Sequence, residues 1–163
     1  MSELQVHSKK SFCVGAEREQ HKLFAMALPG LIRSVEDDLK MLIAHDVGAI
    51  VTMTQDPLIL PLQFRPLFAQ LHLPVENFEP PTIDQIDRFV AFVDGQFDRG
   101  VNVAVHCLMG IGRTGTAIAA YRVSRGETPQ QAIEELRKIR NFIETKEQEE
   151  MVGTYWRHLR KEA

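Results

Sequence analysis

The sequence predicts an α/β domain in which a small, largely parallel sheet is flanked by helices. Short apolar runs at 23–28, 49–54 and 101–105 have the length and the composition of buried strands. Longer segments between and after these runs carry apolar residues at helical spacing. Strands that alternate with helices are typical of a parallel sheet, because each parallel connection must cross over the sheet.

The chain is expected to hold one domain, residues 21–163, after an N-terminal arm formed by residues 1–20. A chain of 163 residues is long enough to bury one real core. The arm is polar and has few periodic apolar positions, with room for a short strand at 11–14. The first strand of the domain, at 23–28, ends at a Pro-Gly pair.

A helix and a second strand come next. Ser34 is a suitable N-cap, and the helix after it has one apolar face, made by Val35, Leu39, Leu42 and Ile43. Residues 49–54 are the second strand. In the proline-broken stretch that follows, the pattern predicts a helix at 63–70 and a short strand at 71–75.

The helix after Pro80 and Pro81 is predicted from both of its ends. Thr82 and Gln85 form a capping-box pattern, in which each side chain bonds the other residue's backbone N–H. Apolar residues then recur along one side until Gly100: Ile83, Ile86, Val90, Val93 and Phe97.

The last third of the chain predicts one strand and three helices. The strand at 101–105 leads through a glycine-rich loop into a helix over 114–125, which a glycine ends. Thr128 and the proline after it open another helix. The last helix carries its apolar residues within 151–159.

Composition narrows the class of protein. Apolar residues are 44% and charged residues 25% of the chain, as in ordinary globular domains, and the net charge is −3. This charge favours neither nucleic acid nor a membrane as partner, and the N-terminus has no apolar run suited to a signal peptide, so a cytoplasmic location is expected.

The two cysteines, Cys13 and Cys107, form no disulfide-like or metal-ligand pattern, so neither a metal nor a cofactor is expected. The sequence leaves the oligomeric state open.

The most informative segment is the loop at 106–115, His-Cys-Leu-Met-Gly-Ile-Gly-Arg-Thr-Gly. A loop between a strand and a helix aims backbone N–H groups and the positive end of the helix dipole at one point, which makes an anion site. The same field favours a thiolate, so Cys107 is predicted to be nucleophilic at neutral pH. Arg113 begins the helix, where its planar fork can hold two oxygens of a phosphate.

These residues resemble the C-x5-R-[ST] signature of the cysteine-based protein tyrosine phosphatases. Cys107, Arg113 and Thr114 occupy its fixed positions, and the form HCxxGxGRTG is similar to the dual-specificity branch. Residues 73–86 resemble the acid-loop segment of that branch. Residues 143–148, Ile-Glu-Thr-Lys-Glu-Gln, are similar to the IETxEQ segment of the small atypical dual-specificity phosphatases.

The resemblance, which runs from about residue 23 to residue 159, implies a function for the predicted domain. It makes residues 21–163 a catalytic domain with the protein tyrosine phosphatase-like fold. It implies hydrolysis of phosphotyrosine, with phosphoserine and phosphothreonine as further substrates, in a phosphorylated protein or peptide. Phosphoinositide phosphatases of this superfamily tend to carry lysines in the loop, whereas Leu108, Met109 and Ile111 are apolar here.

The resemblance also implies roles for single residues. Cys107 is the nucleophile that forms a cysteinyl-phosphate, and Thr114 bonds its sulfur. Gln148 positions the hydrolytic water, Glu144 bonds near the loop, and His106 orients the loop. The phosphate lies in a cradle made by Leu108, Met109, Gly110, Ile111, Gly112 and Arg113.

The residue at the position of the general acid differs from the family pattern. The family places an aspartate just before the aromatic-x-Pro-Pro stretch, and Asn77 stands at that position. An amide cannot donate a proton near neutral pH as a carboxylic acid can. Glu76 and Glu79 are the nearby substitutes, while Asp84 lies where it stabilises a helix dipole. The alternative is a pseudophosphatase that binds phosphotyrosine and turns it over poorly.

Two other functions fit the loop less well. Glycines 110, 112 and 115 spell the dinucleotide pattern G-x-G-x-x-G, but residues 129–140 predict a helix where that site needs a second strand. Arsenate reduction on such a loop needs further redox-active cysteines, and the chain offers only Cys13.

Overall fold

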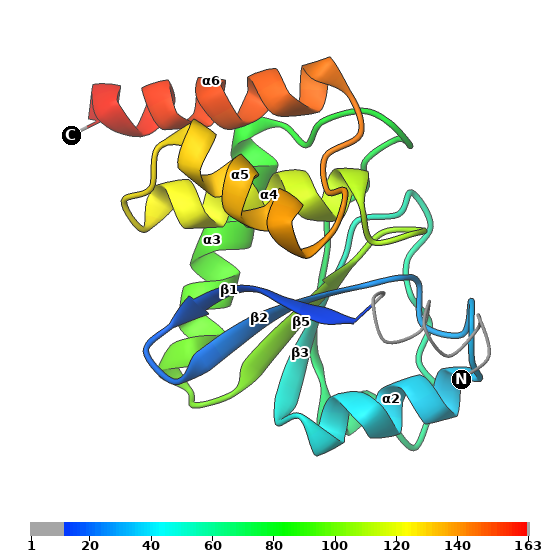
Figure 1. Ribbon diagram of the computed structural model, residues 1–163. Helices are drawn as coiled ribbons and strands as arrows, with labels where there is room; N and C mark the ends of the chain where they lie inside the picture. Colours follow the sequence, from blue (N-terminus) through cyan, green and yellow to red (C-terminus); the bar gives the residue numbers. More distant parts are fainter. Residues whose placement is uncertain (1–11, 163) are drawn as a thin grey trace.

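The computed structural model, which describes residues 12–162, has a five-stranded sheet at its centre (Figure 1). Its spatial order is β1-β2-β5-β3-β4. β1 runs antiparallel to β2, and the other neighbouring pairs are parallel, which confirms the predicted sheet. The strands are β1 (Cys13–Arg18), β2 (His21–Met26), β3 (Val47–Thr52), β4 (Ala69–His72) and β5 (Asn102–His106).

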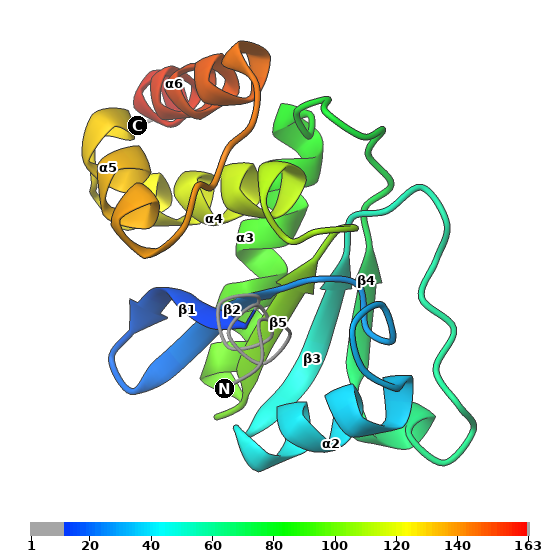
Figure 2. The same ribbon diagram turned by 45° about the vertical axis from the view of Figure 1, so that its right-hand side comes forward.

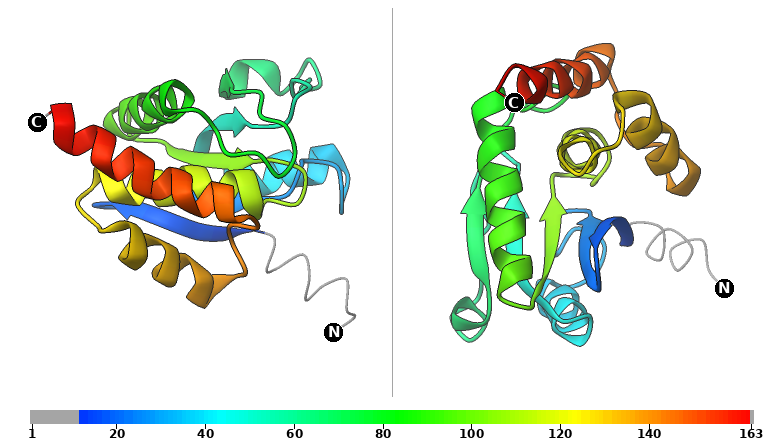
Figure 3. Two further views of the ribbon diagram at one scale, coloured as in Figure 1. Left: turned by 90° about the horizontal axis from the view of Figure 1, so that it is seen from above. Right: turned by 90° about the vertical axis from the view of Figure 1, so that its left-hand side faces the viewer.

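Helices cover both faces of this sheet. One face carries α2, and the other carries α3 and α4, while α5 and α6 pack on α4 (Figure 2). Figure 3 shows α4 along its axis in the right-hand view, between the sheet and the C-terminal helices. The helices are α2 (Val35–Ala44), α3 (Ile83–Asp98), α4 (Gly112–Ser124), α5 (Pro129–Ile139) and α6 (Lys146–Glu162).

The strands are apolar throughout because they are buried on both sides. Successive side chains of a strand point to opposite faces. In β2, Leu23 and Ala25 join the core under α3 and α4, whereas Phe24 and Met26 join the core under α2. The short, continuously apolar runs in the sequence therefore correspond to strands between two helical layers.

The predicted helix caps are present. Ser34 Oγ accepts a hydrogen bond from the backbone N–H of Asp37 at 3.1 Å. Thr82 and Gln85 form the complete capping box, and Thr128 forms a second one with Gln131 at the start of α5. Each of these bonds satisfies a backbone N–H group that the first turn of a helix leaves without a partner.

The predicted helix at 63–70 is wrong. Only a single 3-10 turn forms there, at Arg65–Leu67, and Ala69–His72 is already β4. The turn lets Phe64 and Phe68 both enter the core beneath α2, which explains their helix-like spacing. Beyond it the chain is extended because its backbone pairs with β3 from Ala49 to Thr52.

The sheet also begins within the segment expected to be an arm. Residues 1–11 of that segment lie outside the described residues. Cys13–Arg18 forms the edge strand β1, and Arg18 reaches Asp94 and Asp98 on α3 at 3.1 and 2.6 Å. The short strand expected at 11–14 thus overlaps the start of β1, which continues through the polar residues Glu17 and Arg18.

The topology brings three loops together at one edge of the sheet. The parallel strands β5, β3 and β4 all point to this edge, as Figure 2 shows. The loop after β5 starts with Cys107, the loop after β3 covers residues 53–62, and the loop after β4 covers residues 73–81. Ligands of open α/β sheets bind at the carboxyl ends of the strands, so this edge is the expected place for a site. No described helix is both long and apolar enough to cross a membrane.

Candidate active site

The loop after β5 is arranged so that its carbonyl groups point away from its centre. The carbonyl of Leu108 accepts from Leu28 N–H at 2.9 Å, and that of Ile111 accepts from the N–H groups of Gly115 and Ile143. Arg140 donates to the carbonyl of Met109 at 3.3 Å. Within residues 12–162, the N–H groups of 108–111 donate to no protein acceptor. These N–H groups are therefore available to a bound anion at the start of α4.

Cys107 lies at the floor of this loop. Its side chain is 3% exposed, whereas Leu108 and Met109 on the rim are 39% and 47% exposed. Thr114, in the first turn of α4, donates a hydrogen bond from Oγ1 to Cys107 Sγ at 3.1 Å. A hydroxyl donor and a helix N-terminus both stabilise negative charge on the sulfur.

Gly110 has the backbone shape that the loop requires. Its φ is +71°, and a β-carbon at this position would meet the backbone carbonyl of Met26. An L-residue cannot adopt this conformation without strain, and the neighbouring strand cannot move aside. The glycine thus allows the loop to close tightly against β2.

Replacing Gly110 by alanine should lower the free energy of unfolding by about 1–3 kcal/mol, because both the positive φ and the contact with Met26 are unfavourable. Urea denaturation measures this change. Gly95→Ala, in α3, is the matched control: nothing lies within 4 Å of its added carbon, and alanine there should stabilise by about 0.5–1 kcal/mol. Equal unfolding midpoints for the two variants would contradict this assignment.

Arg113 points from α4 toward the loop after β4. Its side chain is buried, and Nη1 donates to the backbone carbonyl of Val75 at 2.9 Å. The guanidinium carries four further N–H groups, so it can hold this carbonyl and still face an anion, or release the carbonyl in favour of two phosphate oxygens.

His106 holds the start of the loop from below. Its Nδ1 donates to the carbonyl of Cys107 at 3.0 Å, because a carbonyl can only accept. Its Nε2 therefore accepts from Thr52 Oγ1, at 2.9 Å. Burial, and then the charge of Arg113, lower the pKa of His106 to about 4. The imidazole is thus neutral at pH 7, in the tautomer that both bonds need.

The free energy of unfolding should fall as the pH is lowered from 6.5 toward 4. Over this range the unfolded chain protonates His106 while the folded protein keeps it neutral, so the unfolded state binds more protons. The contribution of this residue is about 2–3 kcal/mol. Urea denaturation at pH 7, 5.5 and 4.5 measures it, with His106→Asn as the comparison. A variant that loses as much stability as the wild type between pH 7 and 4.5 would contradict this role.

The segment before α6 ties the loop after β4 to the loop after β5. Gln148 is fully buried, and its Oε1 accepts from the N–H groups of Glu144 and Thr145 while its Nε2 donates to the carbonyl of Glu79 at 3.3 Å. The carboxylate of Glu144 lies over Gly112, where a β-carbon would come within 2.6 Å of its Oε1. Gln148 and Glu144 therefore both border the loop after β5.

The proposed substitutes for the acid lie farther out. Glu76 and Glu79 are exposed and are joined by a backbone hydrogen bond of 3.1 Å within one tight turn. Between them, Asn77 uses its Oδ1 to accept from the N–H of Phe78. Asn77, unlike the two glutamates, lines the cavity that contains Arg113.

That cavity has a volume of about 490 Å³ and opens beside the loop after β5. Its lining includes Arg113 and Leu108, Asn77 from the loop after β4, and residues 54–59 from the loop after β3. Two residues near the site were not predicted from the sequence: Asp56, which lines this cavity, and Thr52, which is buried and bonds His106. Thr52 ends β3 and Asp56 lies four residues later, so a place just after a parallel strand is the positional signal that could have found them.

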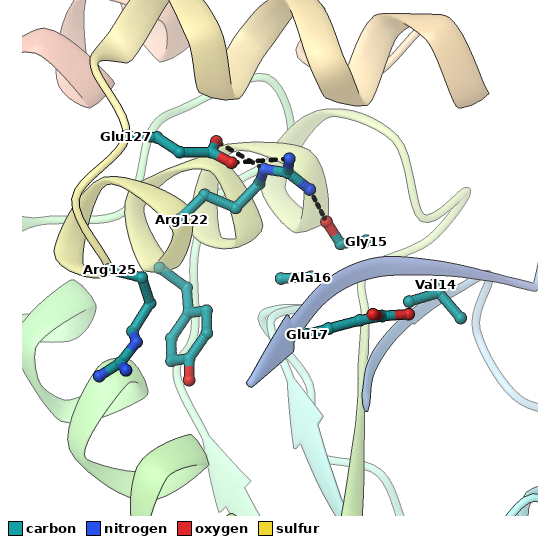
Figure 4. A pocket seen from close by; sticks show the side chains of 8 residues that line it. Val14, Gly15, Ala16, Glu17, Arg122, Arg125 and Glu127 are labelled. Atoms are coloured by element: carbon teal, nitrogen blue, oxygen red, sulfur yellow. Dashed lines mark hydrogen bonds and ion pairs between the residues drawn. The ribbon is translucent and has the colours of Figure 1, made fainter. Parts of the chain in front are cut away.

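A second cavity, of about 400 Å³, lies between β1 and the C-terminal end of α4 (Figure 4). There Arg122 pairs with both carboxylate oxygens of Glu127 at 2.8 Å and donates to the carbonyl of Gly15. Its described lining residues include no nucleophile. Since α4 rises 1.5 Å per residue, this cavity is about 15–20 Å from the loop after β5 and forms no part of that site.

Comparison with known proteins decides the family. Residues 24–127 match the family model Tc-R-P, described as "Polymorphic toxin system, DSP-PTPase phosphatase". The chain belongs to the DSP-PTPase phosphatases. The match spans β2 to the end of α4 and so includes the whole loop after β5.

Curated relatives of this DSP-PTPase include two uncharacterized proteins of Methanocaldococcus jannaschii. They are 36% and 35% identical over 86 residues, which is 52% of this chain and 58% and 54% of the relatives. The chain thus spans just over half the length of these relatives. A tyrosine-protein phosphatase, CDC14 of Candida albicans, is 34% identical over 61 residues, which is 37% of this chain and 11% of that protein.

Solved structures confirm the fold over nearly the whole chain. A glycine-to-alanine mutant form of Tk-PTP superposes with a TM-score of 0.78 at 26% identity, covering 93% of this chain and 97% of that one. PTPMT1 in complex with PI(5)P superposes with a TM-score of 0.76 at 24% identity, covering 90% and 97%. The protein tyrosine phosphatase-like fold predicted from the sequence is therefore confirmed.

Proposed function

We propose that this DSP-PTPase hydrolyses phosphotyrosine in proteins or peptides, and phosphoserine and phosphothreonine as further substrates, through a cysteinyl-phosphate. One observation carries the proposal. The buried sulfur of Cys107 accepts a hydrogen bond from the Thr114 hydroxyl at 3.1 Å, in the loop whose N–H groups at 108–111 have no acceptor among residues 12–162. A nucleophile and an oxyanion cradle thus face the same point.

In the first step the Cys107 thiolate attacks phosphorus in line and the bond to the leaving oxygen breaks. The loop N–H groups, from Leu108 to Gly112, stabilise the equatorial oxygens. Arg113 exchanges its bond to Val75 for two of these oxygens, so that its fork holds the phosphoryl group. No metal or cofactor takes part.

In the second step water attacks the cysteinyl-phosphate and the thiolate leaves. The Thr114 hydroxyl assists, because its bond to sulfur strengthens as negative charge returns. Gln148 borders the loop over Gly112 and is held by the residues around it, so its amide can orient the water. Glu76 and Glu79 are the candidates from the sequence for the general acid that protonates the leaving oxygen.

The shape of the site supports an aromatic leaving group. The cavity beside Arg113 is mainly apolar, with Leu58, Ile59 and Leu108 among its lining residues. An aryl ring in contact with these side chains gains the free energy of removing apolar surface from water.

The proposal includes the cytoplasmic location that is expected from the sequence.

A pseudophosphatase is the second candidate, and Asn77 is the observation that favours it. The residue lines the cavity where the leaving oxygen would lie, and its carbonyl oxygen is already bonded to Phe78. If no other group replaces the acid, phosphotyrosine binds and an activated aryl phosphate reacts, but phosphotyrosine turns over poorly.

The test is the pH profile of kcat on a phosphotyrosine peptide and on an activated aryl phosphate, with the Cys107→Ser variant as blank. Turnover of both substrates, with a basic limb on the peptide, is the expected result. Turnover of the activated ester alone, without a basic limb, would establish the pseudophosphatase. If neither substrate reacts more slowly in the Cys107→Ser variant, the phosphatase proposal is overturned.

A further inference from the structure

The loop after β3 brings a carboxylate to the cavity that contains Arg113. Asp56 lines this cavity together with Asn77, Leu108 and Arg113, and no other acidic side chain of the described residues does so. In an in-line displacement the leaving oxygen departs on the side opposite the attacking sulfur. Because Leu108 and Arg113 belong to both the phosphate cradle and the cavity wall, the leaving group is directed into this cavity.

The backbone around Asp56 is fixed by its neighbours. Thr54 Oγ1 donates to the carbonyl of Asp56 at 2.7 Å, and His72 Nε2 donates to the carbonyl of Thr54 at 2.8 Å. Pro57 further restricts the conformation of the residue before it. The carboxylate of Asp56, by contrast, makes no hydrogen bond or ion pair within residues 12–162, so it is free to meet a ligand.

The other candidates for a proton donor are placed less well. Glu76 and Glu79 do not line the cavity, and Asn77 has no acidic proton. Glu144 lies over Gly112, at the N-terminus of α4, and so borders the phosphate loop without lining the cavity.

We propose that Asp56 is the catalytic acid that replaces the missing aspartate at position 77, an inference that rests on the proposed phosphatase function. As the sulfur of Cys107 bonds to phosphorus, the phosphorus–oxygen bond breaks and the leaving oxygen takes the proton of the Asp56 carboxyl. The Asp56 carboxylate then takes a proton from the water that attacks phosphorus, and the thiolate leaves. The site returns to its starting state, and the net reaction is ester plus water to alcohol plus phosphate.

Asp56→Asn removes this proton while conserving the shape of the side chain. We expect kcat on a phosphotyrosine peptide to fall about 10²–10⁴-fold, because tyrosine is a poor leaving group unless it is protonated. On an activated aryl phosphate, whose leaving group needs no proton, kcat should fall less than about 10-fold. The basic limb of the pH profile should disappear in Asp56→Asn and remain in Asp56→Glu.

Asp46→Asn is the matched control, since it makes the same chemical change in an exposed turn at the other end of β3. Its φ of +59° suits asparagine as well as aspartate, so kcat should not change. Urea denaturation of both variants shows whether each is folded. A second variant, Asp56→Asn with Asn77→Asp, should regain the basic limb, because it restores an acid elsewhere in the same cavity.

The proposal is overturned if Asp56→Asn retains the activity of Asp46→Asn on the peptide. It is also overturned if the basic limb disappears instead in Glu76→Gln, Glu79→Gln or Glu144→Gln. The comparison of wild type with Cys107→Ser separates this failure from that of the proposed function. If the wild type shows no Cys107-dependent turnover, the phosphatase function itself fails and the role of Asp56 fails with it.

Discussion

The Cys107→Ser variant should lose turnover of a phosphotyrosine peptide by about 10⁴-fold or more and should still bind inorganic phosphate. The cradle of loop N–H groups stabilises a thiolate, but a serine hydroxyl remains protonated and is a poor nucleophile without a base. The substitution leaves the N–H groups of the loop in place, so phosphate should still bind. Steady-state kinetics and phosphate titration by calorimetry measure the two effects.

Cys13→Ser is the matched control for this experiment. It makes the same substitution in β1, at the edge of the sheet, where the partly buried thiol has a raised pKa because of desolvation. Turnover should be unchanged in this variant. Loss of activity in Cys13→Ser together with full activity in Cys107→Ser would contradict the assignment of the nucleophile.

The Arg113→Lys variant should lose kcat/KM by about 10³–10⁵-fold although it keeps the positive charge. The guanidinium presents a planar fork that holds two oxygens of the transferring phosphoryl group, whereas an ammonium is a point charge. An arginine that stabilises a phosphoryl-transfer transition state contributes about this factor. Because the contacts with the phosphoryl group strengthen as it is transferred, kcat should fall as well as kcat/KM.

Arg125→Lys provides the control for Arg113. This exposed arginine lies just beyond the other end of α4, on the second cavity, and its replacement should leave kcat and KM unchanged. If Arg113→Lys raised KM alone, with kcat unchanged, the guanidinium would bind substrate and transition state equally. Its proposed role as a transition-state clamp would then be contradicted.

Most of the fold followed from local patterns. The capping boxes at Thr82 and Thr128 and the apolar strands of the parallel sheet are decided by residues close in sequence, because caps and alternation act over a few residues. The prediction of a helix at 63–70 was wrong because a contact between residues distant in sequence decides the structure there. Phe64 and Phe68 are spaced as on a helix, yet pairing with β3 holds the following residues extended.

The sequence by itself predicted the nucleophile and the anion cradle, because both arise within residues 106–115, which run from the end of β5 into the first turn of α4. A strand, a glycine-rich loop and a helix N-terminus fix where Cys107 lies relative to Arg113 and Thr114 without help from distant parts of the chain. In the structure the Thr114 hydroxyl lies 3.1 Å from Cys107 Sγ, and Arg113 precedes it in the first turn of α4.

Only the tertiary structure decided which distant residues border that cradle. Thr52 reaches His106 because β3 and β5 are neighbours in register, and Val75 reaches Arg113 because the loop after β4 ends at the same edge of the sheet. Asp56 shares the cavity with Asn77 although 21 residues separate them in sequence. Such contacts depend on strand order, which results from packing over the whole domain rather than from the propensity of any one segment.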